Sequence, residues 1–221
     1  MVNPGFVKDE KIRSGRKVIG KKIGFTSQAM RKQFGINQPD YGNLFDDQIF
    51  QQGSPIQTVN LIDPRIEGEI AFVLKNDIAG PGITIADVCR ATYGIMASIE
   101  IVDSRFGSGI KFEDSIADNA SCGGVVLGSS VLNLEGLDMR YLGMFIEKDG
   151  LLQSPGTAVE VMGNPLNALA WLANKLAEHN TYLKAGDIIL SGAITGAVTV
   201  TKGDVVNVSF SRLGSIQIRL E

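Results

Sequence analysis

Two glutamates, Glu67 and Glu69, interrupt an otherwise apolar run over residues 66–74. In an extended strand, side chains two positions apart share a face, so both carboxylates point one way and the large apolar side chains point the other. Ala71 and Val73 continue the face that carries the glutamates. We therefore expect a strand that protein covers on both faces, with two like charges held side by side on one of them.

Carboxylates in such a position repel each other and lose hydration, which is tolerable only if they share protons, pair with cations or bind a metal ion. A third acid, Glu100, lies in another short apolar run over 97–102. If the two runs are neighbouring strands, three carboxylates converge, and such an all-oxygen site suits Mg²⁺ or Mn²⁺. The alternative is that the glutamates form structural ion pairs with the nearby Arg65 and Arg105.

Length and charge narrow the class of protein. The chain has 221 residues, enough to bury a full hydrophobic core in one domain. Its 21 basic and 24 acidic residues are intermixed, which leaves no basic stripe for nucleic acid. No apolar run approaches the roughly 20 residues that span a bilayer, and the N-terminus is polar where a signal peptide would be apolar. We expect a cytoplasmic protein that binds neither nucleic acid nor membrane.

The scarcity of cysteine and histidine limits the chemistry. Cys89 and Cys122 are too few for a disulfide framework or a cysteine-built zinc site. The single histidine, His179, excludes histidine-rich zinc sites, and no Gly-x-Ser-x-Gly elbow supports a serine nucleophile. No glycine motif has phosphate-loop spacing, so a nucleotide cofactor is not expected. Acid–base chemistry must then fall to lysine, aspartate, glutamate, tyrosine or metal-bound water.

Strand patterns outnumber helix patterns and do not alternate with them regularly, which indicates a strand-rich α+β fold. In chain order we expect a lead-in over 1–16, a strand over 17–25, a helix over 27–34, a loop over 37–53, strands over 66–74 and 97–102 separated by a helix from 84 to about 93, a helix beginning at Pro165, and strands and turns from 182 onward. The glycine-rich, charged segment 104–119 is typical of either a mobile lid or an ordinary surface loop.

Five motifs in a common order resemble those of the 2-oxopent-4-enoate (2-hydroxypenta-2,4-dienoate) hydratases, within the fumarylacetoacetate hydrolase superfamily. The motifs lie at 20–27 (GKKIGFTS), 38–42 (QPDYG), 67–72 (EGEIAF), 99–105 (IEIVDSR) and 118–123 (DNASCG). The resemblance implies a mixed β-sandwich roll with flanking helices, a divalent ion and a homo-oligomer. It also implies a single catalytic domain over 18–221, preceded by a lead-in over 1–17 that is shorter than the helical N-terminal region of relatives.

The resemblance assigns roles residue by residue. Glu67, Glu69 and Glu100 match the metal ligands, which are the same three acids that strand spacing brings together. Lys22 and Asp40 match the proposed acid–base pair. Read without the resemblance, Lys22 is an exposed member of a twin-lysine pair, and Asp40 is a turn residue after proline.

Further positions match residues that contact the substrate: Ser121, and the loop that contains Ser191 and Gly192. Ser121 has an alternative interpretation, in which it only orders the glycines that follow it. Lys22 alternates with two glycines, and their missing side chains would leave space for a ligand beside it. A nearby metal ion in a closed pocket would disfavour the charged form of this lysine.

The resemblance implies hydration of 2-hydroxypenta-2,4-dienoate or a close relative to the 4-hydroxy-2-oxo acid, in the breakdown of aromatic ring-cleavage products. The companion 4-oxalocrotonate decarboxylases share the scaffold, metal and similar substrates. Their residue at the position of Asp40 is apolar, which favours a hydratase here, whereas segment 191–198 is more similar to the decarboxylase form. A non-catalytic subunit that binds metal and keto acid, associated with a decarboxylase, is the remaining alternative.

Overall fold

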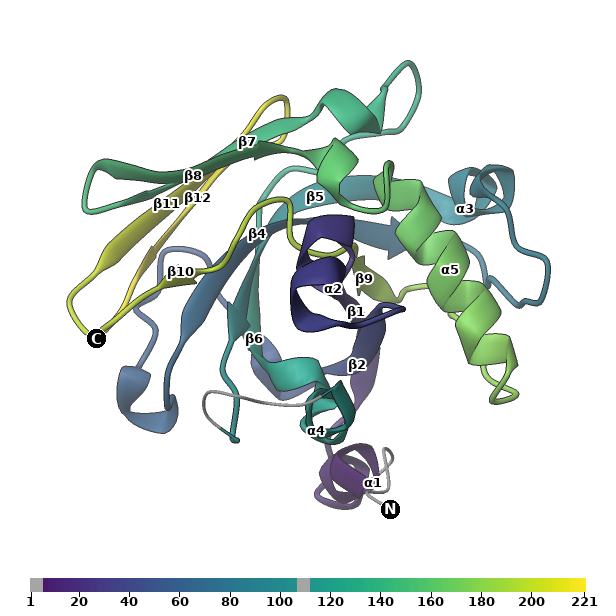
Figure 1. The fold of residues 1–221 in the computed structure, drawn as a ribbon, viewed down its shortest axis with the longest axis horizontal. Helices are drawn as coiled ribbons and strands as arrows, with labels where there is room; N and C mark the ends of the chain where they lie inside the picture. Colours follow the sequence, from purple (N-terminus) through teal and green to yellow (C-terminus); the bar gives the residue numbers. More distant parts are fainter. Residues whose placement is uncertain (1–5, 107–111) are drawn as a thin grey trace.

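The computed structural model describes residues 6–106 and 112–221 (Figure 1). The strands are β1 (Val18–Gly24), β2 (Asp40–Phe45), β3 (Ile49–Phe50), β4 (Arg65–Leu74), β5 (Thr92–Val102), β6 (Cys122–Leu127), β7 (Gly143–Lys148), β8 (Leu151–Thr157), β9 (Ile188–Leu190), β10 (Val198–Thr199), β11 (Val205–Phe210) and β12 (Gly214–Arg219). The α-helices are α1 (Phe6–Arg13), α2 (Gln28–Phe34), α3 (Ile85–Ala91), α4 (Phe112–Ala117) and α5 (Pro165–Ala177). This strand-rich content confirms the α+β prediction.

The strands form two sheets. The larger runs in the order β2-β1-β9-β4-β5-β6-β3, with β10 also paired to β4, and the smaller runs β12-β11-β7-β8 (Figure 1). The small sheet packs on one face of β4 so closely that a Cβ atom at Gly68 would lie 2.6 Å from Cε of Met144 and 2.9 Å from Cγ1 of Val208. Gly68 is therefore required where the two sheets meet.

Both faces of β4 are covered, as its sequence predicts. Four of its large side chains are buried in the main core, between the two sheets and against α5: Ile66, Ile70, Phe72 and Leu74. Ala71, on the opposite face, belongs to a smaller cluster with Leu44 of β2, Val125 of β6 and Leu190 of β9. β2 and β6 lie near opposite ends of the sheet order, so the large sheet must curl for the side chains of Leu44 and Val125 to meet in one cluster. The glutamates lie on this inner face of the curl.

Helices α3 and α5 pack against the main core, on the outer side of the curled sheet. α5 begins as its sequence predicts, with the Asn164 side chain accepting a hydrogen bond from the backbone N–H of Leu166. Such a cap contributes about 1 kcal/mol. One face of this helix is buried through Leu166, Leu169, Leu172, Ala173 and Leu176. α3 carries the expected capping box between Thr84 and Asp87 but ends at Ala91, because the chain continues directly into β5. No helix in the described part of the chain is both long and apolar enough to cross a membrane.

The prediction of a loop over 37–53 is wrong, since this segment contains β2 and β3. Its turn-forming residues are overridden by pairing with β1, in which Gly42 lies opposite Lys22 and Asp40 opposite Gly24. The segment 104–119 includes α4, whereas 107–111 lie outside the described residues, so the predicted lid remains a prediction. The lead-in contains α1, and α2 ends at Gly35 in the left-handed conformation that glycine favours.

Candidate active site

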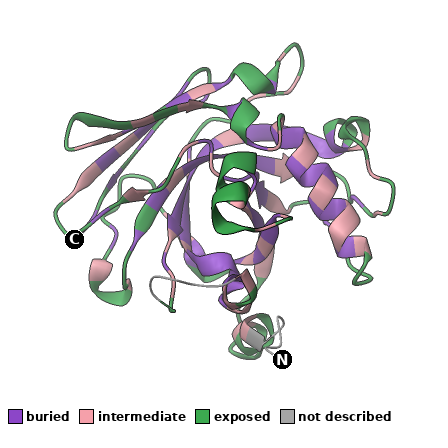
Figure 2. Cartoon of the chain, in the orientation of Figure 1, coloured by how far each residue is buried: buried purple, intermediate pink, exposed green. Residues whose placement is uncertain are grey.

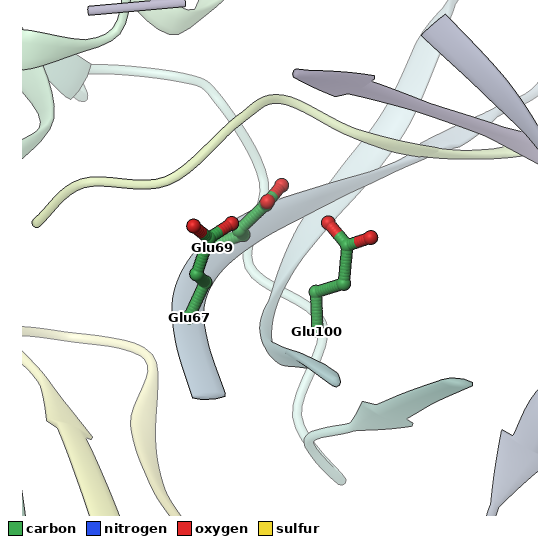
Figure 3. A group of neighbouring side chains, drawn as sticks. All are labelled: Glu67, Glu69 and Glu100. Atoms are coloured by element: carbon green, nitrogen blue, oxygen red, sulfur yellow. The ribbon is translucent and has the colours of Figure 1, made fainter. Parts of the chain in front are cut away.

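Three carboxylates meet on the inner face of the curled sheet. β4 and β5 are antiparallel, and their register places Glu67 directly opposite Glu100, with Glu69 two residues further along β4. One carboxylate oxygen from each of the three lies within 4.8 Å of the others (Figure 3). Glu69 and Glu100 are fully buried, and Glu67 is partly buried.

The charges of these carboxylates are poorly compensated. Oε1 of Glu69 and Oε2 of Glu100 are buried without a hydrogen-bond partner. Burial, followed by the charge of Glu100, raises the pKa of Glu67 to about 7, and burial also raises the pKa values of Glu69 and Glu100. A converging set of buried carboxylate oxygens that lack donors fits a hard divalent cation. The alternative ion pairs are not formed: Arg65 pairs with Asp63, and Arg105 with Asp118.

Lys22 is the cation beside this cluster. It is 4 % exposed, its Nζ atom lies 3.1 Å from Oε1 of Glu100, and it donates a hydrogen bond of 3.0 Å to the carbonyl of Ala120. Burial opposes its charge, but the carboxylates of Glu100 and Asp40 outweigh burial and raise the pKa of Lys22. The protein alone therefore favours the ammonium form of Lys22, in contrast to the expectation from the sequence that a bound cation disfavours it. The interpretation of Lys22 as an exposed lysine is wrong.

Asp40 is held next to Lys22 and is buried. Its Oδ2 accepts a hydrogen bond of 2.7 Å from the Ser115 hydroxyl, while Oδ1 has no partner. The carboxylate occupies the space that Gly24 leaves, because a Cβ atom at Gly24 would lie 2.2 Å from Oδ1. At Gly20, the corresponding space is occupied by the Ile188 carbonyl of β9. The space beside Gly20 and Gly24 is therefore filled by protein atoms, and the expectation that it would hold a ligand is wrong.

A strained loop presents the carbonyl that Lys22 contacts. Asn119, Ala120 and Ser121 adopt successive positive φ angles of 56°, 52° and 54°. Each such residue costs of order 1 kcal/mol or more and persists only where its surroundings fix it. Here the Asn119 side chain clamps β2, accepting from the backbone N–H of Asn43 at 2.7 Å and donating to its carbonyl at 2.8 Å. The loop is therefore anchored on both sides of the Lys22 contact.

A second clamp fixes the same loop from the segment that follows β5. The Arg105 side chain donates to the Asp118 carboxylate and to the backbone carbonyls of Asp118 and Cys122. The Ser121 hydroxyl donates to the same Asp118 carboxylate at 3.0 Å. Ser121 lines the cavity at the site, yet in this structure its hydroxyl proton is directed to Asp118.

Ser191 and Gly192 lie behind the carboxylates. The N–H of Gly192 donates a hydrogen bond of 2.7 Å to Oε2 of Glu69, and the Ser191 hydroxyl is fully buried without a partner. Gly192 has a φ of 107°, and a Cβ atom there would lie 2.2 Å from Oγ1 of Thr26. The cavity wall on this side is formed by the residues that follow, 193–197. Gly192 thus positions a carboxylate, and neither residue lines the cavity.

The cavity has a volume of about 800 Å³ and opens beside the cluster. Lys22, Asp40, Glu67 and Ser121 line it, as does Ser115. Ser115 was not predicted from the sequence, and it lies in the segment interpreted as a lid or surface loop. The role of the Ala120 carbonyl was not predicted either, because a backbone contact leaves no signal in residue type. Asp118 and Asn119 lie inside a motif quoted above, but nothing in that motif distinguishes a clamp from a substrate contact.

Comparison with known proteins identifies several similar chains. Residues 19–221 match the family model described as "Fumarylacetoacetate (FAA) hydrolase C-terminal". A 2-oxo-hept-4-ene-1,7-dioate hydratase from Escherichia coli is 41% identical over 216 residues, covering 95% of this chain and 81% of the relative. A 2-hydroxypent-2,4-dienoate hydratase from Pseudomonas putida is 45% identical over 170 residues, covering 76% and 77%.

A solved structure has the same architecture. It is the 4-oxalocrotonate decarboxylase from Pseudomonas putida G7, complexed with magnesium and adipate. Its TM-score is 0.94 at 36% sequence identity, and the match covers 97% of this chain and 82% of the decarboxylase.

Proposed function

The chain belongs to the fumarylacetoacetate hydrolase family, and on that premise we propose that it is a divalent-metal-dependent hydratase. Its substrate is 2-hydroxypenta-2,4-dienoate or a close relative, and its product is the 4-hydroxy-2-oxo acid. The observation that carries the proposal is the convergence of three buried carboxylates beside Lys22 and Asp40 at one cavity. The reaction belongs to the breakdown of aromatic ring-cleavage products, as the hydratase relatives suggest.

Glu67, Glu69 and Glu100 are proposed to hold the ion, with Mg²⁺ or Mn²⁺ as the candidates. Their unsatisfied oxygens and raised pKa values support this assignment. When bound, such an ion supplies a Lewis acid that stabilises negative charge on the substrate's carboxylate and C2 oxygen. The N–H of Gly192 holds Oε2 of Glu69 in a fixed orientation, so Gly192 is proposed to act through that carboxylate.

Lys22 and Asp40 are proposed to move the protons. Hydration first moves a proton from the C2 hydroxyl to C5, which gives the unsaturated ketone. Water then adds across C3 and C4, with its hydroxyl at C4 and a proton at C3. We propose that Lys22 donates a proton or anchors the substrate's carboxylate, which its contacts with Glu100 and the Ala120 carbonyl support. Asp40 is proposed to orient or deprotonate the attacking water, and its unpartnered Oδ1 supports this. Ser121 contributes a hydroxyl to the cavity wall.

The test is a substrate panel followed by ultraviolet absorbance, with and without Mg²⁺. We expect Mg²⁺-dependent loss of the dienoate and formation of 4-hydroxy-2-oxopentanoate. Glu69→Gln should abolish turnover without unfolding the protein, and unchanged activity in that variant would refute the ligand assignment. Release of CO₂ from 4-oxalocrotonate without dienoate hydration would instead identify a decarboxylase. Binding of Mn²⁺ and a keto acid without turnover of any substrate would identify a non-catalytic subunit.

The wider organisation is also proposed. Residues 18–221 form one catalytic domain, and the chain acts in the cytoplasm as a homo-oligomer that can associate with a decarboxylase. Size-exclusion chromatography with light scattering tests the assembly, since the measured mass of a homo-oligomer is a multiple of the 23.7 kDa chain mass.

A further inference from the structure

We propose that this cavity contains an apolar subsite built by the β1–α2 connection and α2, and that it selects dienoates with an apolar substituent at C5 over those that end in a second carboxylate. The inference rests on the proposed hydratase function and names the substrate class within it. It departs from the Escherichia coli relative, whose name specifies a 1,7-dioate.

The size of the cavity is the first observation. Its volume of about 800 Å³ lies within the range of pockets that hold drug-sized ligands. A five-carbon dienoate bound at the carboxylate cluster fills only a small part of that space. The remainder can accept a substituent on the substrate, and the lining of the cavity decides which kind.

The second observation is an apolar wall formed by Phe25, Met30 and Phe34. Phe25 has a φ of 53°, which is uncommon for an aromatic residue, and its ring meets the edge of Phe34 with centroids 6.0 Å apart. α2 buries none of its residues, and Figure 2 shows it mainly exposed in front of buried strands. Phe25 also packs against the ring of Phe112, with centroids 6.4 Å apart. Met30 is 37% exposed and Phe34 56%, so the described part of the chain leaves much of these two apolar side chains uncovered.

The third observation is charge. Among the described residues that line the cavity, the cations are Lys22 and Arg65. Lys22 is paired with Glu100, and Arg65 with Asp63 at 3.3 Å. Glu160 also lines the cavity, next to the start of α2, where its carboxylate accepts a hydrogen bond from Ser27. A second carboxylate on the substrate would meet this acid, and the Arg65 guanidinium that could pair with it is already shared with Asp63, a further acid in the cavity lining, so its binding is unfavourable.

The experiment compares kcat/KM of the Mg²⁺-loaded protein for three substrates: 2-hydroxypenta-2,4-dienoate, 2-hydroxyhexa-2,4-dienoate and 2-hydroxyhepta-2,4-diene-1,7-dioate. We expect the six-carbon dienoate to be the best substrate, by up to about tenfold over the five-carbon one, because one added carbon in an apolar pocket gives a factor of that order. The dioate should be at least tenfold poorer. A dioate turned over as well as the six-carbon dienoate would overturn the inference.

Two variants locate the selectivity. Phe34→Ala should lower the ratio of kcat/KM between the six-carbon and five-carbon dienoates toward one, and Glu160→Gln should raise turnover of the dioate. Val59→Ala is the matched control, since Val59 is 84% exposed and is not among the residues that line the cavity. If Phe34→Ala changes the oligomeric state in light scattering but leaves the ratio intact, this surface is a subunit contact and the inference fails.

A binding measurement separates the two proposals. Saturated 2-oxo acids do not react, so calorimetry with 2-oxopentanoate, 2-oxohexanoate and 2-oxoheptanedioate reports the subsite without catalysis. If none of the dienoates is hydrated while 2-oxohexanoate binds more tightly than the dioate, the subsite stands and the hydratase proposal fails. If hydration is observed and the dioate binds most tightly, the hydratase proposal stands and the subsite fails.

Discussion

Lys21 and Lys22 are neighbours on β1, yet they occupy opposite environments. Lys22 points into the curled sheet and contacts Glu100 and the Ala120 carbonyl. Lys21 points out of it and donates a hydrogen bond of 2.8 Å to Oδ1 of Asn43. Both are almost fully buried, at 8% and 4% exposure for Lys21 and Lys22. Burial alone therefore does not decide what a lysine does.

The difference lies in the charges that accompany burial. Burial, reinforced by the nearby charge of Lys8, lowers the pKa of Lys21 to about 8. For Lys22, the surrounding carboxylates reverse the effect of burial and raise the pKa. On the inner face of β1, the surrounding acids stabilise the charge of Lys22. On the outer face, the charge of buried Lys21 lowers the stability of the fold.

The largest expected effect contrasts the two lysines directly. Lys22→Met keeps most of the side-chain length but removes the ammonium group, so hydratase kcat should fall by about 10³, within the range for loss of a general acid or base. Lys21→Met should leave kcat within twofold, because that side chain faces away from the site. Steady-state absorbance assays on both variants test this. Equal losses would mean that both faces of β1 serve the reaction.

The second-largest effect is expected from weakening the hydrogen bonds between Asn119 and Asn43, which hold the strained loop. Asn119→Asp keeps an acceptor for the Asn43 N–H but cannot donate to the Asn43 carbonyl. We expect kcat to fall by about tenfold with little change in KM, as for misplacement of a catalytic group. Asn43→Ala is the control, because it retains both backbone bonds to Asn119 and removes only the partner of Lys21. A similar loss of kcat in both variants would argue against the clamp.

The acids that surround Lys22 predict how pH affects stability. The pKa of Glu67 is raised from its usual 4.5 to about 7, so its contribution to folding is present below the unfolded pKa and is lost as pH rises through about 7. A bound divalent ion offsets this loss, since it binds the ionised form. Mg²⁺ should therefore raise the melting temperature more at pH 8 than at pH 5.5. Calorimetric melting with Mg²⁺ and with chelator measures the difference, and an equal shift at both pH values would contradict it.

The smallest expected effect is the change in folding stability when Lys21 is replaced by methionine. Holding its pKa at about 8 instead of 10.5 costs roughly 3 kcal/mol of folding free energy at neutral pH. Lys21→Met removes that cost but leaves Oδ1 of Asn43 without a donor, which costs about 1–3 kcal/mol. At pH 7 the variant should be as stable as the wild type or slightly more so.

The pH dependence of the Lys21 effect has a defined sign. Between about pH 8 and 10.5, the unfolded chain binds a proton at Lys21 that the folded chain does not, so wild-type stability rises with pH relative to Lys21→Met. Urea unfolding of both proteins at pH 7 and pH 10 tests this. If the stability difference is the same at both pH values, Lys21 does not titrate as the structure indicates.

Sequence periodicity predicted much of this arrangement. The alternation along 66–74 placed Glu67 and Glu69 on a covered face, and the structure puts Glu100 opposite Glu67 on that face. The same alternation separates Lys21 from Lys22, but it does not show which of them faces the acids. That depends on which strand lies beside β1 and on how the sheet curls, and both are set by residues distant in sequence.

The predictions from sequence that were wrong or missing also depend on contacts between residues distant in the chain. The segment 37–53 contains proline, glycine and asparagine typical of a loop, yet Gly42 is required inside a strand, since a Cβ atom there would lie 2.4 Å from the Asn119 carbonyl. Ser115 carries no local pattern, and its contact with Asp40 spans 75 positions of the chain. The apolar wall of α2 was not anticipated either, because its exposed apolar side chains make sense only beside a cavity.

Gly68 joins two requirements in one backbone position. On one side of β4 it admits Met144 and Val208 from the second sheet, and on the other it separates the carboxylates of Glu67 and Glu69. A bulkier residue there would push the sheets apart and tilt both carboxylates together. Substitutions in α2 can therefore change the substrate without disturbing the fold. The positions of Glu67 and Glu69 and the packing of the two sheets, in contrast, can only change together.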